Sequence, residues 1–247
     1  MREGVPCGWG VVHLLDGVVY EGEWSTRGLI HGRGALRLPN GNAYWGSWAD
    51  SHKHGRGSFG WADGSRHDGL YIAGKRCGMG RIRYASGAIY EGGFLNDARH
   101  GQGCLSLPNG SFYRGTWNED ERKGHGLFVE PGKQRYVGDW ENGVRSGKGK
   151  LTDTGPAGGG GWYEGDFLDG LPHGHGVMNH GGMTFEGPVE QGIWTGGGWL
   201  ELSPGGDRFE GMWEGGLPRG QGMWYYTKQE GQQTECSFEE GCKQRAG

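Results

Sequence analysis

The sequence is poor in aliphatic side chains and contains no long segment free of glycine. Leucine, isoleucine, valine and phenylalanine make up only about 16% of the 247 residues, too little for the core of an ordinary globular domain. The longest run without glycine has nine residues, from Gln232 to Glu240. An average α-helix needs about 11–12 residues, and a membrane-spanning helix about 20. The composition therefore argues against helical bundles, Rossmann-like folds and transmembrane proteins.

Signals for export and for nucleic-acid binding are also missing. No apolar segment follows Met1-Arg2-Glu3-Gly4, so we expect neither a signal peptide nor a transit segment. The five cysteines are scattered without a Cys-x-x-Cys pair, which favours a reducing compartment over a disulfide framework or a zinc site. The 25 Lys and Arg against 29 Asp and Glu leave no basic excess for nucleic acid. We expect a cytoplasmic protein with no nucleic-acid partner.

Glycine and large aromatic residues are abundant instead. The chain has 58 glycines, 12 tryptophans and 10 tyrosines, with a formal net charge of only −4. Unpatterned glycine at this level is typical of disorder, whereas many aromatic residues and a low net charge are not. This combination indicates a β-rich chain or a repeat array, so the period of the sequence decides between them.

Two signatures recur about every 23 residues. The first has the form aromatic-x-Gly-x-aromatic, and its nine copies begin at Tyr20, Tyr44, His67, Tyr90, Tyr113, Tyr136, Tyr163, Phe185 and Phe209. The second resembles His-Gly-x-Gly, and its copies begin at His31, His54, Cys77, His100, Lys123, Ser146 and His173. Nine cores with one period identify a repeat protein.

The two signatures in fixed phase resemble the MORN (membrane occupation and recognition nexus) repeat family, whose unit reads roughly Y-x-G-x-W, H-G-x-G and N/D-G. The resemblance extends from Gly8 to about Gly241. It is weakest at 67–71, where His67 replaces the tyrosine, and at 185–198. In the second segment Val189 replaces the tryptophan, and Thr-Gly-Gly-Gly replaces His-Gly-x-Gly.

Each repeat is predicted to form a β-hairpin. Turn dipeptides lie between the two signatures at Asp16-Gly17, Asn40-Gly41, Asp63-Gly64, Ser86-Gly87 and Asn109-Gly110. They suit type I′ turns, in which both central residues need a positive φ. Strand alternation places the two aromatic residues of each core on one face and mostly polar residues on the other. A single hairpin is marginally stable, so neighbouring hairpins must stack.

The predicted fold is all-β: an elongated, twisted antiparallel β-hairpin repeat array, or single-sheet solenoid. We expect one domain over 1–247 with about nine full repeats and partial repeats at both ends. Thr234-x-Cys236-x-Phe238 occupies the phase of a tenth core without its first aromatic residue and glycine, as expected of a terminal cap. The glycine-rich insertion 154–161 is expected to be a mobile loop at one edge of the sheet.

The sequence offers no convincing catalytic, cofactor or metal site. His31, His54, His100 and His173 should lie about 10 Å apart, because each repeat adds two strands, so they cannot surround one zinc ion. Structural hydrogen bonding is the favoured interpretation, with zinc at a contact between copies as an alternative seen in some apicomplexan relatives. The Gly-x-Gly segments precede no helix that would bind phosphate. We therefore expect a non-enzyme without cofactors.

Aromatic residues on the polar face are the clearest binding signal. Alternation directs the following residues away from the core: Trp45, Phe112, Trp162, Trp199 and Tyr225, with Met223 beside Tyr225. Exposed aromatic side chains favour protein contacts. Alternatively, a curled sheet covers both faces. We hypothesise that the end formed by Trp199, Met223 and Tyr225 contributes a protein interface.

The family resemblance implies a non-catalytic scaffold or adaptor in which a rigid repeat rod positions partner proteins. Similar arrays occur in cytoskeletal and ciliary assemblies, so a cytoskeletal, axonemal, radial-spoke-like role is the specific expectation. A first alternative is a phosphoinositide or membrane tether, for which the densest basic cluster is Lys75, Arg76, Arg81 and Arg83. A second is a regulatory subunit docked to an enzyme or motor protein. Homo-oligomerisation stays open.

Overall fold

The computed structural model describes residues 7–155, 160–203, 205–227, 232–239 and 242–244. Its contacts divide the chain into two compact units, residues 1–121 and 122–247. The first contains β1 (Gly8–His13), the 3-10 turn η1 (Leu15–Gly17), β2 (Val19–Trp24), β3 (Ile30–Arg37), β4 (Ala43–Ala49), β5 (His52–Gly60), β6 (Arg66–Ile72), β7 (Lys75–Arg83), β8 (Ile89–Leu95), β9 (Ala98–Ser106) and β10 (Phe112–Asn118).

The second unit consists of strands alone over its described residues. β11 begins at Glu121, the last residue of the first unit. The strands are β11 (Glu121–Glu130), β12 (Gln134–Glu141), β13 (Val144–Asp153), β14 (Trp162–Leu168), β15 (Leu171–His180), β16 (Met183–Glu190), β17 (Ile193–Trp194), β18 (Gly196–Glu201), β19 (Arg208–Glu214), β20 (Leu217–Tyr225), β21 (Gln233–Glu239) and β22 (Cys242–Gln244).

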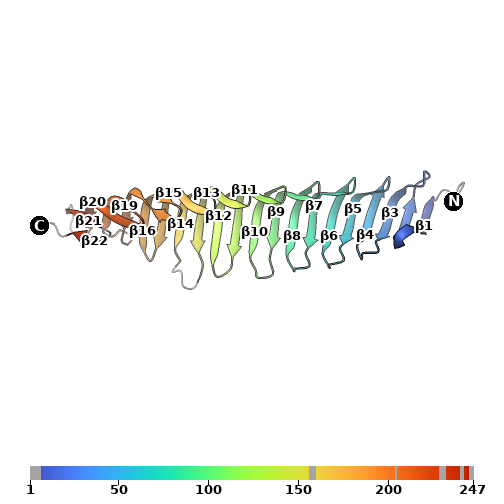
Figure 1. The fold of residues 1–247 in the computed structure, drawn as a ribbon, viewed down its shortest axis with the longest axis horizontal. Coiled ribbons are helices and arrows are strands. Elements are labelled where there is room, and N and C mark those ends of the chain that lie inside the picture. The colour runs from blue at the N-terminus through green and yellow to red at the C-terminus, as the bar shows by residue number, and fades with distance from the viewer. Residues whose placement is uncertain (1–6, 156–159, 204, 228–231, 240–241, 245–247) are drawn as a thin grey trace. The chain divides into compact units, whose positions relative to one another are not determined.

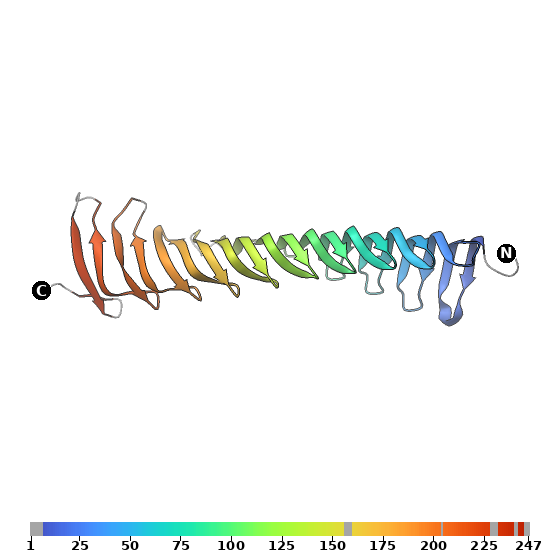
Figure 2. The same ribbon diagram turned by 90° about the horizontal axis from the view of Figure 1, so that it is seen from above.

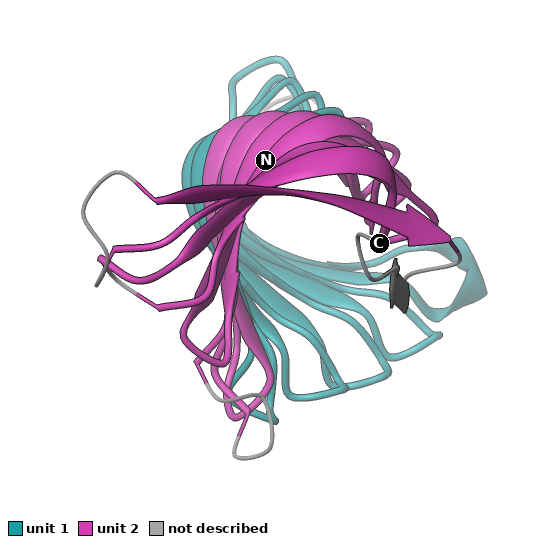
Figure 3. Cartoon of the chain, turned by 90° about the vertical axis from the view of Figure 1, so that its left-hand side faces the viewer, with its two compact units in different colours: residues 1–121 teal, residues 122–247 magenta. Residues whose placement is uncertain are grey.

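Within each unit, strands that follow one another in the sequence pair antiparallel and form an open sheet (Figure 1). The strands lie obliquely to one another in the view from above, as the natural twist of a sheet requires (Figure 2). They are also strongly bent, which is visible in the end view of either unit (Figure 3). The predicted all-β hairpin array is confirmed.

The hairpins that follow the Gly-x-Gly strands close with a different turn from the one predicted. In the first, the Gly41 N–H donates to the Leu38 carbonyl at 3.0 Å, so Pro39 and Asn40 are the central residues of the turn. Gly41 has a φ of 86°, whereas Asn40 is not left-handed. This is a type I turn followed by a left-handed glycine, a geometry that suits proline at its first central position.

Asp63-Gly64, Ser86-Gly87 and Asn109-Gly110 repeat this geometry. The expectation of type I′ turns was therefore wrong at these positions. Asp16-Gly17 alone among the five dipeptides has both φ values positive, at 63° and 78°.

Type I′ geometry occurs at the opposite edge of the sheet, after eight of the nine aromatic cores; after the core of Tyr20, Gly28 donates to the Ser25 carbonyl at 3.0 Å instead. Ala49 pairs with His52, and the two residues between them, Asp50 and Ser51, have φ values of 46° and 64°. Both residues are left-handed in the further pairs Ala73-Gly74, Asn96-Asp97, Glu119-Asp120, Asn142-Gly143, Asp169-Gly170, Gln191-Gly192 and Gly215-Gly216. The second N–H of each turn donates to a backbone carbonyl one repeat earlier, as Ser51 does to Ile30 at 2.8 Å. These turns therefore join consecutive repeats.

The aromatic residues of the cores are the buried interior of the sheet. Tyr20, Tyr90 and Tyr136 have no exposed surface, and the second aromatic residues, such as Trp117, are almost as buried. In most repeats the first ring contacts, edge-on, the second ring of its own core and that of the next, as Tyr90 does with Phe94 and Trp117 at 5.2 and 5.5 Å. Edge-to-face pairs at this spacing stabilise beyond the area that they bury. The predicted stacking of aromatic residues along the array is confirmed.

Paired glycines make room for these rings. Gly46 lies opposite Gly57, and a Cβ on Gly46 would lie 2.5 Å from the Gly57 Cα and from the Tyr44 hydroxyl. The first glycine of each His-Gly-x-Gly has a separate role, because Gly55 has a φ of 66° within a β-bulge. One glycine of this signature thus allows the left-handed backbone and the other allows close approach of the ring.

The tyrosine hydroxyl completes the bulge. In the repeat of Tyr44, the register shifts between Gly46 and Trp48 and leaves Ser47 outside the ladder to β5. The Tyr44 hydroxyl donates to the Ser47 carbonyl at 3.0 Å. Burial raises the pKa of Tyr44 to about 12, which keeps the hydroxyl protonated. The same bond is made by Tyr20, Tyr90, Tyr113, Tyr136 and Tyr163.

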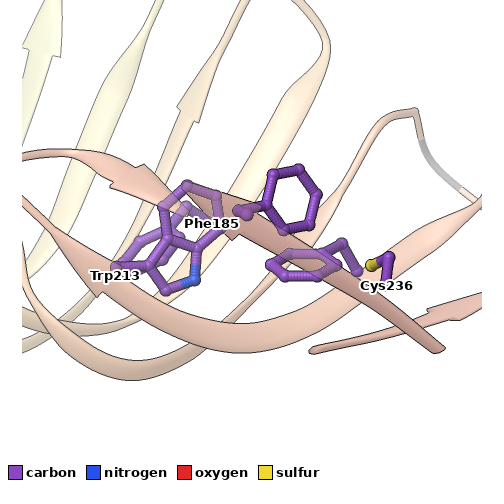
Figure 4. Packing of buried hydrophobic residues seen from close by; sticks show 5 residues of the cluster. Phe185, Trp213 and Cys236 are labelled. Carbon is purple, nitrogen blue, oxygen red and sulfur yellow. The ribbon is translucent and has the colours of Figure 1, made fainter. Parts of the chain in front are cut away.

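The degenerate tenth core forms strand β21. β21 pairs with β20, and its Cys236 and Phe238 are buried against Phe209 and Trp213. The side chains of this cluster lie within the bend of the strands (Figure 4). Part of the glycine-rich insertion, residues 156–159, lies outside the described residues.

Candidate functional site

A column of basic side chains covers the buried rings, one in each of five consecutive repeats. Its members in the first unit are Lys53, Arg76 and Arg99, and those in the second are Arg122 and Arg145. The Arg99 guanidinium lies 4.1 Å from the centre of the Trp117 ring, and Lys53 lies 4.7 Å from that of Phe59. These are cation–π distances. Burial lowers the pKa of Lys53.

Arginines of this column also form hydrogen bonds with residues of the type I′ turns. Arg99 bonds the Asp120 carboxylate at 2.7 Å and the Asp120 carbonyl at 2.8 Å, and Arg76 makes the same two contacts with Asp97. Sequence reasoning missed this column, although its members recur at a spacing of 23 residues. The arginines are engaged with their own sheet, so the column is structural rather than a free anion site.

The opposite face of the sheet has a glycine floor. Open hollows of roughly 530–630 Å³ lie on this face, and the backbone of the paired glycines forms their floor. Gly138, Gly149 and Gly165 floor one such hollow in the second unit, together with Lys148 and Lys150. Both lysines are paired with carboxylates across the strands. We call this side the glycine face and the other side the aromatic face.

The aromatic residues predicted to face away from the core are distributed along the glycine face. Trp45 is 44% exposed and lines a hollow in the first unit. Phe112 and Trp162 are partly covered by cations: Arg114 of the same strand lies 5.9 Å from the Phe112 ring, and Lys150 of the neighbouring strand lies 4.3 Å from the Trp162 ring. These three aromatic residues do not form one site.

Trp199, Met223 and Tyr225 come together on the glycine face of the second unit. Trp199 on β18 and Met223 on β20 both pair with Glu210 of the strand between them. Tyr225 pairs with Arg208, whose guanidinium lies 4.6 Å from the Trp199 ring. Trp199 and Tyr225 both line one open hollow of about 570 Å³.

The basic cluster Lys75, Arg76, Arg81 and Arg83 is divided between the two faces. Arg76 lies on the aromatic face in its ion pair with Asp97, and Arg81 is paired with Glu91 at 3.0 Å on the glycine face. Two of the four charges are thus neutralised by acidic residues of the same sheet. Lipid headgroups would meet a weaker cluster than the sequence spacing implies.

The histidine column shows no function of its own. His31 and His54 are exposed, and neither they nor His100 and His173 make a side-chain hydrogen bond with any described residue. The favoured hydrogen-bonding interpretation was therefore wrong for these four. Over the described part of the chain, no cluster of three or more histidine, cysteine, aspartate and glutamate side chains is placed to hold a metal ion.

No helix in the described part of the chain is long and apolar enough to cross a bilayer.

The geometry of paired glycines, tyrosine hydroxyls and edge-on rings recurs in the segments that match a known family model. The MORN repeat model matches residues 20–43, 44–66, 67–89, 90–112, 113–129, 136–154, 163–179 and 209–230. The chain belongs to the MORN repeat family. The MORN match omits the core of Phe185, where the sequence departs most from the repeat. The strands β16 and β18 nevertheless pair antiparallel there.

Similarity of this MORN chain to other known proteins is otherwise distant. No curated protein matches it. Among solved structures, the TCP10 domain of Danio rerio CPAP in complex with a STIL peptide is 11% identical, covers 100% of this chain and 99% of its own, and has a TM-score of 0.41. The TCP domain of Drosophila melanogaster SAS-4 with a proline-rich motif of Ana2 is 13% identical, with 73% and 88% covered and a TM-score of 0.37.

Proposed function

We propose that this MORN repeat protein is a non-catalytic scaffold that binds partner proteins through side chains on the glycine face. The observation that carries the proposal is the convergence of Trp199 and Tyr225 around one open hollow, with Met223 paired to Glu210 beside them. Tryptophan, tyrosine and methionine are enriched in protein interfaces, whereas monomeric proteins seldom gather them on an open surface.

The surface is also built to keep its shape. Trp199 is held by the guanidinium of Arg208, and Arg208 is in turn 3.7 Å from the Glu210 carboxylate on the same strand. These side chains project from paired strands rather than from a loop, so a partner would meet a preorganised contact with little loss of side-chain entropy. Preorganisation of this kind fits a spacer that presents partners at fixed positions.

The test is a double substitution, Trp199→Ser with Tyr225→Ser, in the full-length protein. Proximity labelling of the wild type in its own cells identifies candidate partners, and purified partners are then used in pull-down. We expect the double variant to lose at least about tenfold in affinity, because aromatic anchors dominate interface energies. Trp162→Ser is the matched control on the same face, with circular dichroism to confirm folding of both variants. Unchanged partner affinity in the double variant contradicts the proposal.

A cytoskeletal or ciliary axonemal location, with a radial-spoke-like role, is the finer form of this proposal. The resemblance to MORN arrays of such assemblies supports it. Fluorescent tagging at the endogenous locus tests it. Signal along the axoneme or another cytoskeletal structure is the expected outcome, and a diffuse signal without a stable partner contradicts it.

A further inference from the structure

A second exposed apolar surface lies on the glycine face of the first unit. It is formed by Trp9, Arg33, Trp45, Arg56, Leu70 and Met79, which we call the Trp/Arg strip. The exposed fractions are 64% for Trp9, 44% for Trp45, 38% for Leu70 and 68% for Met79. Side chains of this size are left open to solvent on five consecutive strands and β1, so the strip is a contiguous feature rather than scattered single residues.

The repeat places these side chains in line. Trp9, Arg33, Arg56 and Met79 occupy the variable position of Gly-x-Gly on β1, β3, β5 and β7. Two open hollows of about 550 and 530 Å³ lie along them and share Trp45 and Arg56 as walls. The hollows therefore follow one another across the strands and offer a continuous shallow track.

The charge of this track is not neutralised as it is in the second unit. There, the side chains at two equivalent positions lie beside carboxylates: His125 lies 3.2 Å from Asp139, and Lys148 lies 2.6 Å from Asp166. In the first unit Arg33 pairs with Ser47 and Arg56 pairs with Leu70, neither of which carries a charge.

The carboxylates that line the two hollows are paired with other arginines, as Asp68 is with Arg66 at 2.9 Å. Glu21 faces Arg37 at 3.8 Å, and the Glu23 carboxylate accepts the backbone N–H of Arg33. Neither Arg33 nor Arg56 forms an ion pair with any residue that the structure describes. Two arginine guanidiniums thus stand beside exposed tryptophans without a carboxylate of their own.

We propose that the Trp/Arg strip is a docking surface for an extended, acidic segment of a partner protein that also carries apolar side chains. Carboxylates of the segment would take the forked hydrogen bonds of the guanidiniums, and its apolar side chains would cover Trp45 and Met79. Tryptophan, arginine and methionine are the residue types that concentrate binding energy at interfaces. The inference rests on the proposed protein-binding function and adds a second surface with a defined partner chemistry.

The experiment uses a random peptide display library as the probe and the full-length protein as bait. Selection on the wild type is followed by counter-selection on the double variant Arg33→Glu with Arg56→Glu. We expect enrichment of peptides rich in aspartate and glutamate with interspersed leucine or aromatic residues. Failure to enrich peptides, or enrichment of neutral or basic ones, would overturn the proposal.

An enriched peptide is then synthesised with a fluorescent label, and its affinity is measured by fluorescence anisotropy. We expect the double arginine variant to weaken binding at least about tenfold and Trp45→Ser at least about fivefold, with affinity falling as salt is raised. Lys148→Glu is the matched control, because it reverses a charge at the equivalent position of the second unit, and it should change affinity less than about twofold. Equal affinity in the arginine variant and the wild type contradicts the proposal.

Two further arms separate the other outcomes. Vesicles of phosphatidylcholine with phosphatidylserine are floated with the wild type and the arginine variant. Arginine-dependent flotation without peptide enrichment would assign the strip to a membrane and overturn the peptide proposal. Trp199→Ser with Tyr225→Ser should leave the affinity of the acidic peptide unchanged, so a failure of this surface is distinguishable from a failure of the proposed function.

Discussion

The repeats of Tyr90 and Phe209 have the same strand arrangement and the same β-bulge, but different groups bond the backbone at the middle residue of that bulge. In the first, Gly93 lies outside the ladder to β9, and its carbonyl accepts the Tyr90 hydroxyl at 3.0 Å. In the second, where phenylalanine has no hydroxyl, Met212 at the corresponding position pairs with the backbone of Arg219. A buried carbonyl needs a donor, and either a side chain or the neighbouring strand can supply it.

The other two repeats without tyrosine follow the second solution. Leu70, after His67, pairs with Cys77, and the Pro188 carbonyl, after Phe185, accepts the Thr195 N–H at 3.0 Å. One hydroxyl group therefore decides whether the middle residue of the bulge joins the ladder. The comparison explains how MORN repeats with divergent first residues keep the same fold.

The largest effect is expected where a regular repeat is most tightly packed. A Cβ on Gly103 would lie 2.7 Å from a carbon of the Tyr90 ring, whereas a Cβ on Gly197 would come no closer than 3.7 Å, to the Met212 sulfur. We expect Gly103→Ala to cost about 3 kcal/mol or more, because the ring and the paired glycine backbone must both move. Denaturant unfolding of both variants measures the difference.

Gly197→Ala is the control from a divergent repeat, and we expect it to lie within about 0.5 kcal/mol of the wild type. Equal losses in the two variants would mean that the paired glycines are not the tight point of the repeat.

A smaller effect is expected from pH, through a buried histidine of the first unit. Burial, followed by the charge of Arg76, lowers the pKa of the fully buried His67 to about 4. The unfolded chain takes up this proton below about pH 6.5 and the folded chain does not, so the free energy of unfolding falls as the pH decreases from about 6.5 to 4. We expect a loss of about 1–2 kcal/mol at pH 4.5, after allowance for screening by solvent.

The measurement is hydrogen exchange of β6 and β7 as a function of pH, with Tyr136 in the second unit marking the equivalent non-titrating position. His67→Tyr should flatten the dependence, because tyrosine does not titrate in this range. A slope that persists in this variant would assign the effect to another group.

The smallest effect concerns the hydroxyl group itself. Tyr90→Phe removes the donor to the Gly93 carbonyl and should cost about 1 kcal/mol. Phe209→Tyr should bring no comparable gain, because Met212 is already paired with Arg219. Thermal unfolding of the two single variants tests the pair. A gain from Phe209→Tyr as large as the loss from Tyr90→Phe would show that backbone pairing does not replace the hydroxyl.

Much of the fold could be predicted because the period fixes it. Regular placement of tyrosine, glycine and tryptophan two residues apart identifies the buried face. A glycine excess is typical of disorder, but here the glycines occur at the same positions of each repeat, which indicates a structural role. The turns were harder. Pro39-Asn40 favours a type I turn in the printed sequence, but Ala73 and Glu119 give little indication that they adopt a positive φ. Those two are left-handed because the turn length and its bond to the previous repeat require it.

The candidate sites were only partly predictable for a related reason. Strand alternation correctly directed Trp45 and Trp199 onto the glycine face. It fails across the bulge, where three residues of one strand oppose one of its neighbour, so the basic column does not follow from counting by two. The column that contains Arg76 and Arg99 is nevertheless detectable in the sequence, since its members recur with the period of the repeat. The unpaired state of Arg33 depends on what lies across the sheet, which a linear pattern does not contain.

The two edges of the sheet differ in what they let evolution or an engineer change. At one edge, every type I′ turn has two residues, and its N–H is bonded to the repeat before it. At the other, connection length varies, and the longest, between β13 and β14, includes the glycine-rich insertion. Among the described strands, the connection between β2 and β3 is the one exception to the two-residue turns at the first edge, so added sequence is admitted mainly at the second. New modules, tags or binding loops inserted there would all project from the same side of a unit, at intervals set by the repeat.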